Sequence, residues 1–519
     1  MTHNATTGIH DLPDDVLLLI FKAVYSMSRK YPGRDNRSVS IFEADKNDVI
    51  WQDEDVSSPS NLFPDSLVPM CRLWKDTLSS VSAFWTRLVI FVDERPTPLS
   101  AITSRLALAA ERALEIKLTR RHGSWPDADL SEQARVNAVI SFLSAHMSRW
   151  KTLRLDVLHS SSVPRPHVAM HGDAANLVDL RLHSRLKDAP LLAYCSSLVI
   201  QATDDSNRMP TTHILETDIE IGPPLTVTTN QRHINQQLRA PRMSELQLDG
   251  VIFFASYSCA PVTWMSVRKL TVTHCVSPPS GMFTANMLLT CLNTMPSLRE
   301  LTLVEVALEF YEEAMPALVH CGLQRCTFVD IPEQMLAALV GLLQNSELTS
   351  LTVKRCSMRR WAPGQWPLSS LTLEGINKSD DVLEALRAWP PRVLTVENCA
   401  GFDKVILAAL ADPYIFTCPG MQVLELSDCQ GISSRELRMM IEGRQGGIGD
   451  DDAVDLDVGF ISTLRVTGCG ELDPNDKVFF QEHAFLRQVE WDGQMISEDF
   501  ESDVDSVGWA RADDFSDEE

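Results

Sequence analysis

The feature that most constrains this chain is a short apolar motif that returns along most of its length. From residue 150 onward the motif reads apolar, two residues, apolar, one residue, apolar, as in Leu298-Arg-Glu-Leu301-Thr-Leu303. Its second anchors are mostly about 20 to 31 residues apart, a spacing typical of stacked repeats. They are Leu153, Leu180, Leu198, Leu246, Leu270, Leu301, Cys326, Leu351, Leu371, Leu394, Leu424, Leu464 and Val489. This period predicts a solenoid of similar units.

Each triplet of alternating apolar residues is expected to form a short strand, because successive side chains of a strand point to opposite faces. Amphipathic stretches at 332–344 and 380–388 predict helices on the other side of the repeat. One repeat cannot bury its apolar face alone, so neighbours stack into a parallel sheet. The predicted fold class is therefore an α/β leucine-rich-repeat solenoid over residues 91–496, with a weaker first strand at 114–118.

Five cysteines share one position of the repeat, five residues after the second anchor. They are Cys275, Cys356, Cys399, Cys429 and Cys469, and the same slot holds Val251, Val306, Ile331 and Ile376 in other copies. A slot that accepts cysteine, valine or isoleucine predicts a small buried site filled for its packing volume. The alternatives are a metal ladder or disulfides. Reducing surroundings, the absence of any CxxC pair and the interruption by valine and isoleucine disfavour both.

The first ninety residues follow a different, helical pattern. Asp11 and Pro13 suit a helix start, and apolar residues then recur at helical spacing through Val24. A second helix is expected over 65–78, and Phe84-Trp85 forms a third apolar anchor. Three helices this short barely make a core alone, so they need a partner or the domain behind them.

These residues, in their order and chemistry, resemble the F-box, especially that of mushroom-type fungal F-box proteins. The resemblance covers residues 9–90 and rests on Leu12-Pro13, the apolar helix that follows, Met70-Cys71-Arg72-Leu73-Trp74 and Phe84-Trp85. It implies that the module docks on the Skp-type adaptor of a cullin ubiquitin ligase. The matching apolar positions, and so the implied adaptor-binding residues, are Leu12, Pro13, Val16, Ile20, Cys71 and Trp74. The cysteine-bearing repeats also resemble those of F-box leucine-rich-repeat proteins.

Two features depart from the family pattern. A polar insertion at about 29–64 separates the first two helices and is interpreted as a solvated loop. Pro69 is compatible with the second helix if it falls in the first helical turn. The alternative interpretation is that these segments are the first helices of a larger helical cap.

Composition restricts the kinds of partner. The net charge of −24 at pH 7 argues against nucleic acid and anionic membranes, which would repel such a surface. No apolar run is long enough to span a bilayer, and the first residues do not form a signal peptide. The expected location is the cytoplasm, the nucleus or both. The acidic stretch 497–519 is expected to be a disordered tail, and the stretch from Gly446 to Asp452 a flexible loop.

Known catalytic motifs are absent from the sequence. There is no phosphate-binding loop, dinucleotide fingerprint, nucleophile elbow or zinc-protease helix. His167 and His171 are interpreted as loop residues, and His274, next to Cys275, as an outward residue at a strand end. No catalytic residue, metal or cofactor is therefore predicted.

Three hypotheses of function remain. The first is a non-catalytic substrate-recognition subunit that binds the Skp-type adaptor and cullin ligase core, and whose solenoid binds an unknown target protein. The second is a repeat scaffold outside any ubiquitin ligase, and the third is an enzyme on an unusual repeat fold. The outward strand residues are the candidates for target binding: Arg154, Arg181, Gln247, Lys354, Arg465 and Glu490.

Overall fold

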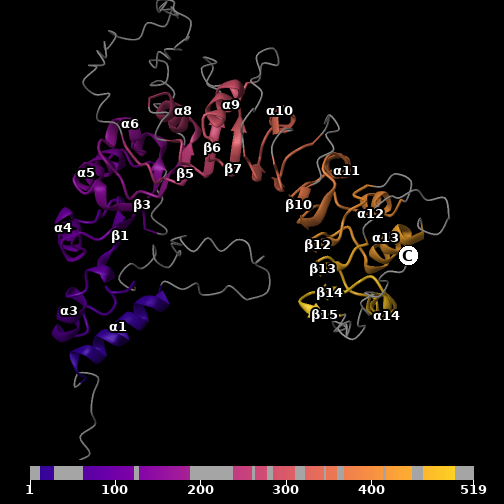
Figure 1. The fold of residues 1–519 in the computed structure, drawn as a ribbon, viewed down its shortest axis with the longest axis horizontal. Helices are drawn as coiled ribbons and strands as arrows, with labels where there is room; N and C mark the ends of the chain where they lie inside the picture. The colour runs from indigo at the N-terminus through magenta and orange to yellow at the C-terminus, as the bar shows by residue number, and fades with distance from the viewer. Residues whose placement is uncertain are drawn as a thin grey trace, which may run out of the picture. The chain divides into compact units, whose positions relative to one another are not determined.

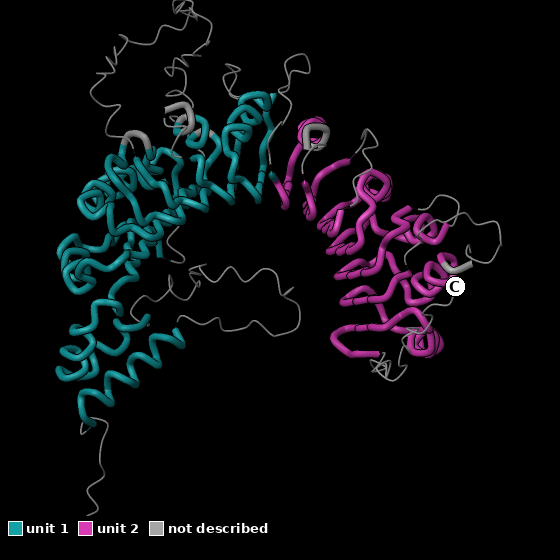
Figure 2. The backbone as a smooth tube through the Cα atoms, in the orientation of Figure 1, with its two compact units in different colours: residues 1–322 teal, residues 323–519 magenta. Residues whose placement is uncertain are grey.

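The structure is a computed structural model that forms two compact units, residues 1–322 and 323–519 (Figure 2). It describes residues 12–28, 62–121, 128–186, 238–259, 264–276, 284–309, 322–343, 347–358, 368–412, 417–446 and 460–496. Most of the predicted insertion, the predicted acidic tail and the repeat copy anchored by Leu198 lie outside these residues. Each unit is an α/β arrangement in which the helices lie on one side of the strands (Figure 1).

Unit 1 begins with a small helical module. It contains α1 (Asp14–Ser28), α3 (Arg72–Ser79) and the 3₁₀ helix η3 (Ser82–Trp85). The carbonyl of Pro13 accepts the first hydrogen bonds of α1, from the amides of Val16 and Leu17. Phe21 of α1 then packs edge-on against Trp74 of α3, with ring centroids 5.3 Å apart. The predicted first helix and third anchor are thereby confirmed.

The second helix begins later than the sequence indicates. Residues 63–70 form turns, and α3 starts only at Arg72. The thiol of Cys71 caps this start, because its Sγ accepts a hydrogen bond from the amide of Trp74 at 3.5 Å. Pro69 therefore precedes the helix and does not lie in its first turn, so its missing amide costs α3 nothing.

Within the described residues, the sheet of unit 1 has seven parallel strands in chain order. They are β1 (Arg87–Phe91), β2 (Leu114–Thr119), β3 (Trp150–His159), β4 (Asp179–Leu186), β5 (Glu245–Asp249), β6 (Lys269–Val276) and β7 (Glu300–Ala307). The helices of this unit are α4 (Leu99–Leu108), α5 (Glu132–Ser144), α6 (Pro166–Ala169), α8 (Gly250–Cys259) and α9 (Ala285–Asn293), with short 3₁₀ turns η4 (Met147–Arg149) and η5 (Ser160–Ser162). Strand β1 was not predicted, and the sheet begins inside the segment assigned to the helical module.

Unit 2 repeats the same plan. Its strands are β8 (Arg325–Val329), β9 (Ser350–Lys354), β10 (Leu368–Glu374), β11 (Pro391–Glu397), β12 (Val423–Ser427), β13 (Thr463–Thr467), β14 (Gln488–Trp491) and β15 (Gln494–Met495). Its helices are α10 (Glu333–Leu343), α11 (Ser379–Ala388), α12 (Lys404–Ala411), α13 (Ser434–Gly446) and α14 (Pro474–Glu482). All pairings are parallel except the last, where β15 turns back antiparallel on β14 and ends the repeat run.

The repeat anchors determine the register of both sheets. Within unit 1, Leu180 pairs with Leu246, and Leu270 pairs with Leu301, so second anchors stand side by side. These anchors are almost fully buried, while the residues between them are only partly covered. The predicted solenoid of alternating strands is confirmed, as are the helices expected over 332–344 and 380–388.

From β6 to β13, each strand has the same unusual backbone turn at or near its end. The residue before the cysteine slot has a positive φ at His274, Glu305, Asp330, Arg355, Asn398 and Asp428, and glycine takes this place at Gly375 and Gly468. Such a conformation costs free energy for residues other than glycine, least for Asn, Asp and His. The turn redirects the chain so that the slot residue points into the core.

The cysteine slot is buried as predicted, and the thiols there are free. However, packing volume is not its whole role. The Sγ of Cys399 accepts a hydrogen bond from the amide of Ile376, the slot residue of the preceding repeat, at 3.3 Å. The same bond joins Ile331 to Cys356 at 3.3 Å. Burial raises the pKa of the Cys356 thiol to about 11, so this group stays protonated at neutral pH.

We therefore expect Cys399→Val to lower the free energy of unfolding by about 1–2 kcal/mol, because the buried amide of Ile376 loses its acceptor. Cys399→Ser should recover part of the loss, since a hydroxyl can accept the same bond. The control is Cys291→Val, because Cys291 is buried in α9 and its thiol accepts no amide from a neighbouring repeat. Chemical denaturation gives the free energy of unfolding of all three variants. Equal, small effects of the two valine variants would show that volume alone matters.

Candidate functional site

Helix α1 has apolar residues on two sides. Leu17 and Phe21 are buried against the rest of the module. Val16, Ile20, Ala23 and Met27 follow one another at spacings of three or four and therefore share a second side. That side is covered little: Ile20 is 38 % exposed and Met27 is 69 % exposed. An exposed apolar helix face of this kind is a candidate docking surface.

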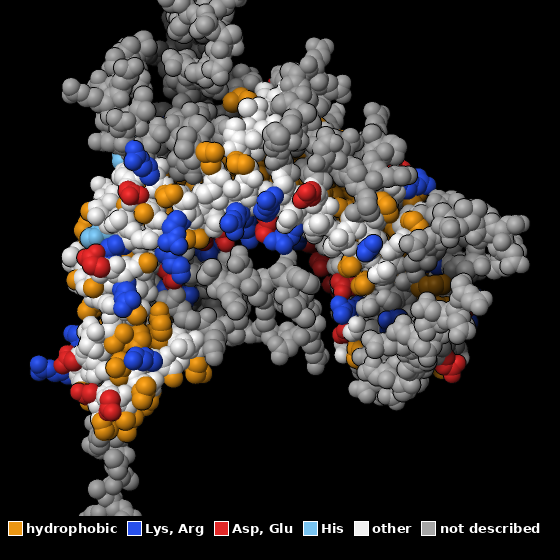
Figure 3. All heavy atoms as spheres, in the orientation of Figure 1, with side chains coloured by type: hydrophobic (Ala, Val, Ile, Leu, Met, Phe, Trp, Pro, Cys, Tyr) orange, Lys and Arg blue, Asp and Glu red, His pale blue; other side chains and the backbone are white. Residues whose placement is uncertain are grey.

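We call this surface the α1 face and define it by its half-buried or exposed apolar residues. They are Leu12, Val16, Leu19, Ile20, Val24 and Met27, with Met70 from the turn before α3 as a further exposed apolar side chain of the module. Figure 3 shows hydrophobic side chains gathered over the part of unit 1 that holds α1 and α3. A polar strip of Asp15, Lys22 and Ser26 runs along another side of the same helix.

The six residues expected to bind an adaptor divide into three groups. Leu12, Val16 and Ile20 belong to the α1 face, and Pro13 is exposed at the start of the helix. Cys71 is half-buried and caps α3. Trp74 is only 8 % exposed and packs beneath α1, so it supports the face from inside. Sequence reasoning did not single out Leu19, Met27 or Met70 as surface residues, although apolar residues beyond the buried side of α1 were a visible signal.

Charged residues on the outward side of the first strands form ion pairs with one another. The carboxylate of Asp179 on β4 forms ion pairs with Arg154 Nη2 at 2.7 Å and with Arg181 Nε at 2.9 Å. Arg181 in turn reaches Glu245 of β5 at 2.7 Å. Two of the predicted target-binding residues, Arg154 and Arg181, therefore belong to one network that spans β3, β4 and β5.

Unit 2 contains similar pairs. Lys354 of β9 contacts Glu374 of β10, and Arg465 of β13 contacts Glu425 of β12. Glu490 of β14 lies 3.8 Å from Arg465. A partner that binds the strand face must compete with these pairs or match their alternation of charge, which favours selectivity over affinity.

A row of threonines also crosses the strand face of unit 2. Thr327, Thr352, Thr372 and Thr395 are aligned on four successive strands by the pairing of β8 to β11. All four are partly exposed. β-Branched residues favour strands, so this row needs no ligand to explain it. It does give the strand face a neutral, hydroxyl-bearing section.

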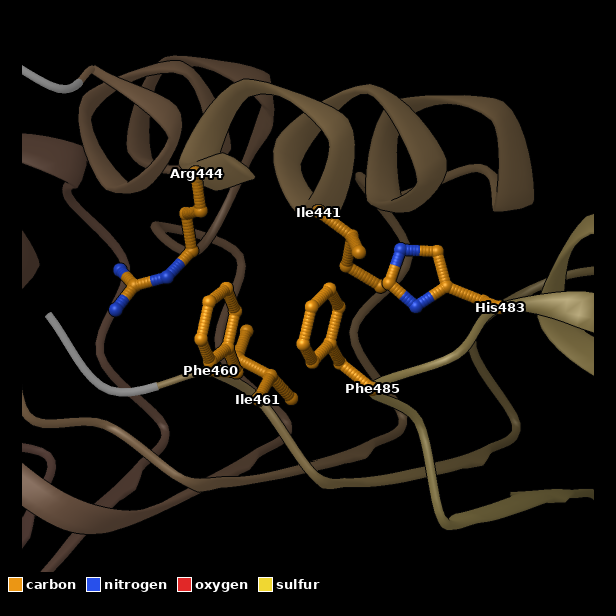
Figure 4. A pocket seen from close by; sticks show the side chains of 6 residues that line it. All are labelled: Ile441, Arg444, Phe460, Ile461, His483 and Phe485. Carbon is orange, nitrogen blue, oxygen red and sulfur yellow. The ribbon is translucent and has the colours of Figure 1, made fainter. Parts of the chain in front are cut away.

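A small pocket lies near the C-terminal end of unit 2. Figure 4 shows its lining by Ile441, Arg444, Phe460, Ile461, His483 and Phe485. Phe460 and Phe485 stack with ring centroids 4.0 Å apart, which closes much of the space. Its cavity volume of about 10 Å³ holds at most one water molecule. The guanidinium of Arg444 donates hydrogen bonds to the carbonyls of Leu410 and Cys418. This pocket is therefore part of the packing of the last repeats.

The described residues contain no group of three or more His, Cys, Asp or Glu side chains placed to hold a metal ion. None of the helices in the described ranges is long and apolar enough to cross a membrane. His274 lies at an outward strand end and Cys275 in the core, as predicted. His167 lies in the one-turn helix α6, not in the predicted loop, because Pro166 begins that helix at a position where proline is tolerated. Its side chain and most of the glycine-rich loop from Gly446 lie outside the described residues.

The fold defines the class of the protein: an α/β solenoid of the leucine-rich-repeat type, preceded by an N-terminal helix. The chain matches no protein-family model, and a search of the curated proteins found no match.

Proposed function

We propose that this chain is a non-catalytic substrate-recognition subunit of a Skp/cullin/F-box ubiquitin ligase, acting in the cytoplasm or nucleus. The observation that carries the proposal is the α1 face, an exposed apolar helix side directly after the Leu12-Pro13 motif. A helix that is apolar on its outer side as well as its inner side needs a second covering surface. A Skp-type adaptor would supply that surface.

The proposed mechanism is proximity. The α1 face would hold the adaptor and the ligase core, while the strand face of the solenoid would hold a target protein. Confining the target beside the ubiquitin-carrying enzyme raises the effective concentration of its lysines. No reactive side chain of this chain takes part in the transfer. The paired charges and the neutral threonine row of the strand face would select the target by complementarity.

The adaptor contact is tested with the double variant Leu19→Asp, Ile20→Asp. Both side chains are exposed, so the fold should keep its thermal midpoint, while adaptor affinity should fall about tenfold or more through buried charge at the interface. The matched control is Lys22→Asp on the polar strip, which changes the net charge by the same amount. Binding of purified full chain to a Skp-type adaptor is measured by calorimetry.

Three results separate the outcomes. Loss of binding in the double variant but not in Lys22→Asp supports the proposal. Equal binding by all forms excludes the α1 face as the contact. If the unaltered chain shows no affinity for the adaptor, the second hypothesis, a repeat scaffold outside any ligase, replaces this one.

A further inference from the structure

Two histidines of unit 1 lie close together although they belong to distant parts of the sequence. His183 is on β4 and His274 is at the end of β6, with β5 between them. Their ring centroids are 6.1 Å apart, and the ring planes are tilted by 43°. Both side chains reach solvent: His183 is 33 % and His274 is 21 % exposed.

Each imidazole is held by a carboxylate on its outer side. His183 Nδ1 lies 3.1 Å from Asp156 Oδ1 on β3, and His274 Nδ1 lies 2.7 Å from Glu305 Oε2 on β7. A carboxylate that accepts a hydrogen bond from Nδ1 selects the ring tautomer whose proton is on that nitrogen.

This arrangement leaves the other ring nitrogens available. Neither His183 nor His274 has another hydrogen-bond partner among the residues that the structure describes. In a neutral imidazole with a proton on Nδ1, Nε2 carries a lone pair. The two carboxylates stand on opposite outer strands, β3 and β7, so a metal ion held by both Nε2 atoms would lie over β5.

We propose that His183 and His274 form a two-histidine site for a divalent transition-metal ion of the zinc class. Imidazole nitrogen suits Zn²⁺, Cu²⁺ and Ni²⁺, and metal-binding histidines usually donate their second N–H to a carboxylate, as both do here. Zinc–nitrogen bonds are about 2.0–2.1 Å, which places two rings on one ion with centroids roughly 5–6 Å apart. The observed 6.1 Å needs only a small side-chain shift.

The ion would complete its coordination with water. The described residues offer no third protein ligand, which fits an exchangeable surface site better than a structural one. Arg185 Nη2 lies 3.4 Å from Asp156 Oδ2, so one carboxylate shares its charge between a guanidinium and an imidazole. Bound metal would join the ends of β4 and β6 across β5. Its affinity would fall in acid, because protonated imidazole cannot bind it.

The test is a calorimetric titration of metal-stripped full chain with zinc chloride. His183→Ala and His274→Ala should each remove one zinc equivalent, and the double variant should remove no more than either alone, because both residues act on one ion. His146→Ala is the control, since that side chain is half-buried and makes its ring contact with Phe142 of α5. Without zinc, His183→Ala and His146→Ala should keep the wild-type thermal midpoint, whereas His274→Ala should lower it slightly, because alanine tolerates the positive φ at that position less well than histidine does.

Two results would overturn the site. One is a zinc stoichiometry and affinity unchanged by either single variant. The other is loss of two equivalents in the double variant, which would mean that the histidines bind separate ions. Glu305→Gln supplies an independent arm: it keeps both imidazoles and should weaken zinc binding by about tenfold, as loss of a supporting carboxylate does. Unaltered affinity in that variant would contradict the assigned role of the carboxylate.

Discussion

Replacing Arg120 with methionine is expected to lower the free energy of unfolding of unit 1 by about 3–5 kcal/mol. Arg120 follows β2 and is only 1 % exposed. Its Nη1 donates to Glu132 Oε1 and Asp129 Oδ2, both at 2.8 Å. Methionine fills most of the volume but leaves a buried carboxylate without its counter-charge.

The carboxylate of Glu132 makes this loss large. Glu132 begins α5 and is fully buried. Its carboxylate also accepts hydrogen bonds from the backbone amides of Leu158, at 2.9 Å, and His159, at 3.0 Å, at the end of β3. The side chain of Glu132 therefore joins the end of β2, the start of α5 and the end of β3. Without Arg120, the hydrogen bonds from the two backbone amides remain, but the buried carboxylate of Glu132 has no positive charge beside it.

Acid should weaken the same network. Burial acts to raise the pKa of Asp129, but hydrogen bonding from Arg120 and the charge of Arg135 lower it below the ordinary value of 3.8. A carboxyl group whose folded pKa is depressed stabilises the fold fully above its ordinary pKa, and that contribution is lost as the pH falls through the folded value. The difference between the wild type and Arg120→Met should therefore shrink below about pH 3.8.

Hydrogen exchange of the β3 segment measures the effect locally, because the amides of Leu158 and His159 report directly on the Glu132 contacts. The control is Arg72→Met. The Arg72 side chain is 94 % exposed and lies 3.7 Å from Asp76, so its loss should change stability by less than about 0.5 kcal/mol. Similar protection in Arg120→Met and wild type would mean that the buried pair contributes nothing to this part of the sheet.

The buried pattern of the repeats was readable from the sequence because it depends on local alternation. Anchors such as Leu301 and Leu371 define strands by their spacing, and equivalent anchors pair because each strand repeats its neighbour. Strand β1 escaped this reasoning, since Arg87-Leu-Val-Ile-Phe91 is a continuous apolar run with no alternation. It was also hidden by its position, directly after the helical anchor Phe84-Trp85.

Contacts that involve two neighbouring repeats could not be predicted from the sequence. The hydrogen bond from Ile376 to Cys399 needs the backbone of one repeat and the thiol of the next, and neither residue type implies it alone. The proximity of His183 and His274 likewise requires the strand order β4-β5-β6. For α1, the spacing indicated one broad apolar face, and only the packing shows that Leu17 and Phe21 are buried while Ile20 on the same helix is left exposed.

The contact between neighbouring turns predicts a second large effect, in unit 2. A Cβ atom added at Gly401 would stand 2.5 Å from the carbonyl carbon, 2.6 Å from the oxygen and 2.7 Å from the nitrogen of Lys378. All three are backbone atoms, so no side chain can move aside. The amide of Gly401 also donates to the carbonyl of Ile376 at 2.9 Å, which holds the two turns together.

We therefore expect Gly401→Ala to lower the free energy of unfolding of unit 2 by about 3 kcal/mol, through overpacking that shifts the backbone. Lys378 is the N-cap of α11, so the displacement should also loosen the start of that helix. Gly420→Ala is the matched control, because a Cβ there meets no atom within 4 Å. Because alanine has less conformational freedom than glycine in the unfolded chain, Gly420→Ala should leave the free energy of unfolding unchanged or raise it by up to about 1 kcal/mol. Chemical denaturation of both variants decides the matter. If Gly401→Ala unfolds at the same denaturant concentration as Gly420→Ala, the turns of adjacent repeats do not touch as described, and the close stacking of β10 on β11 needs another explanation.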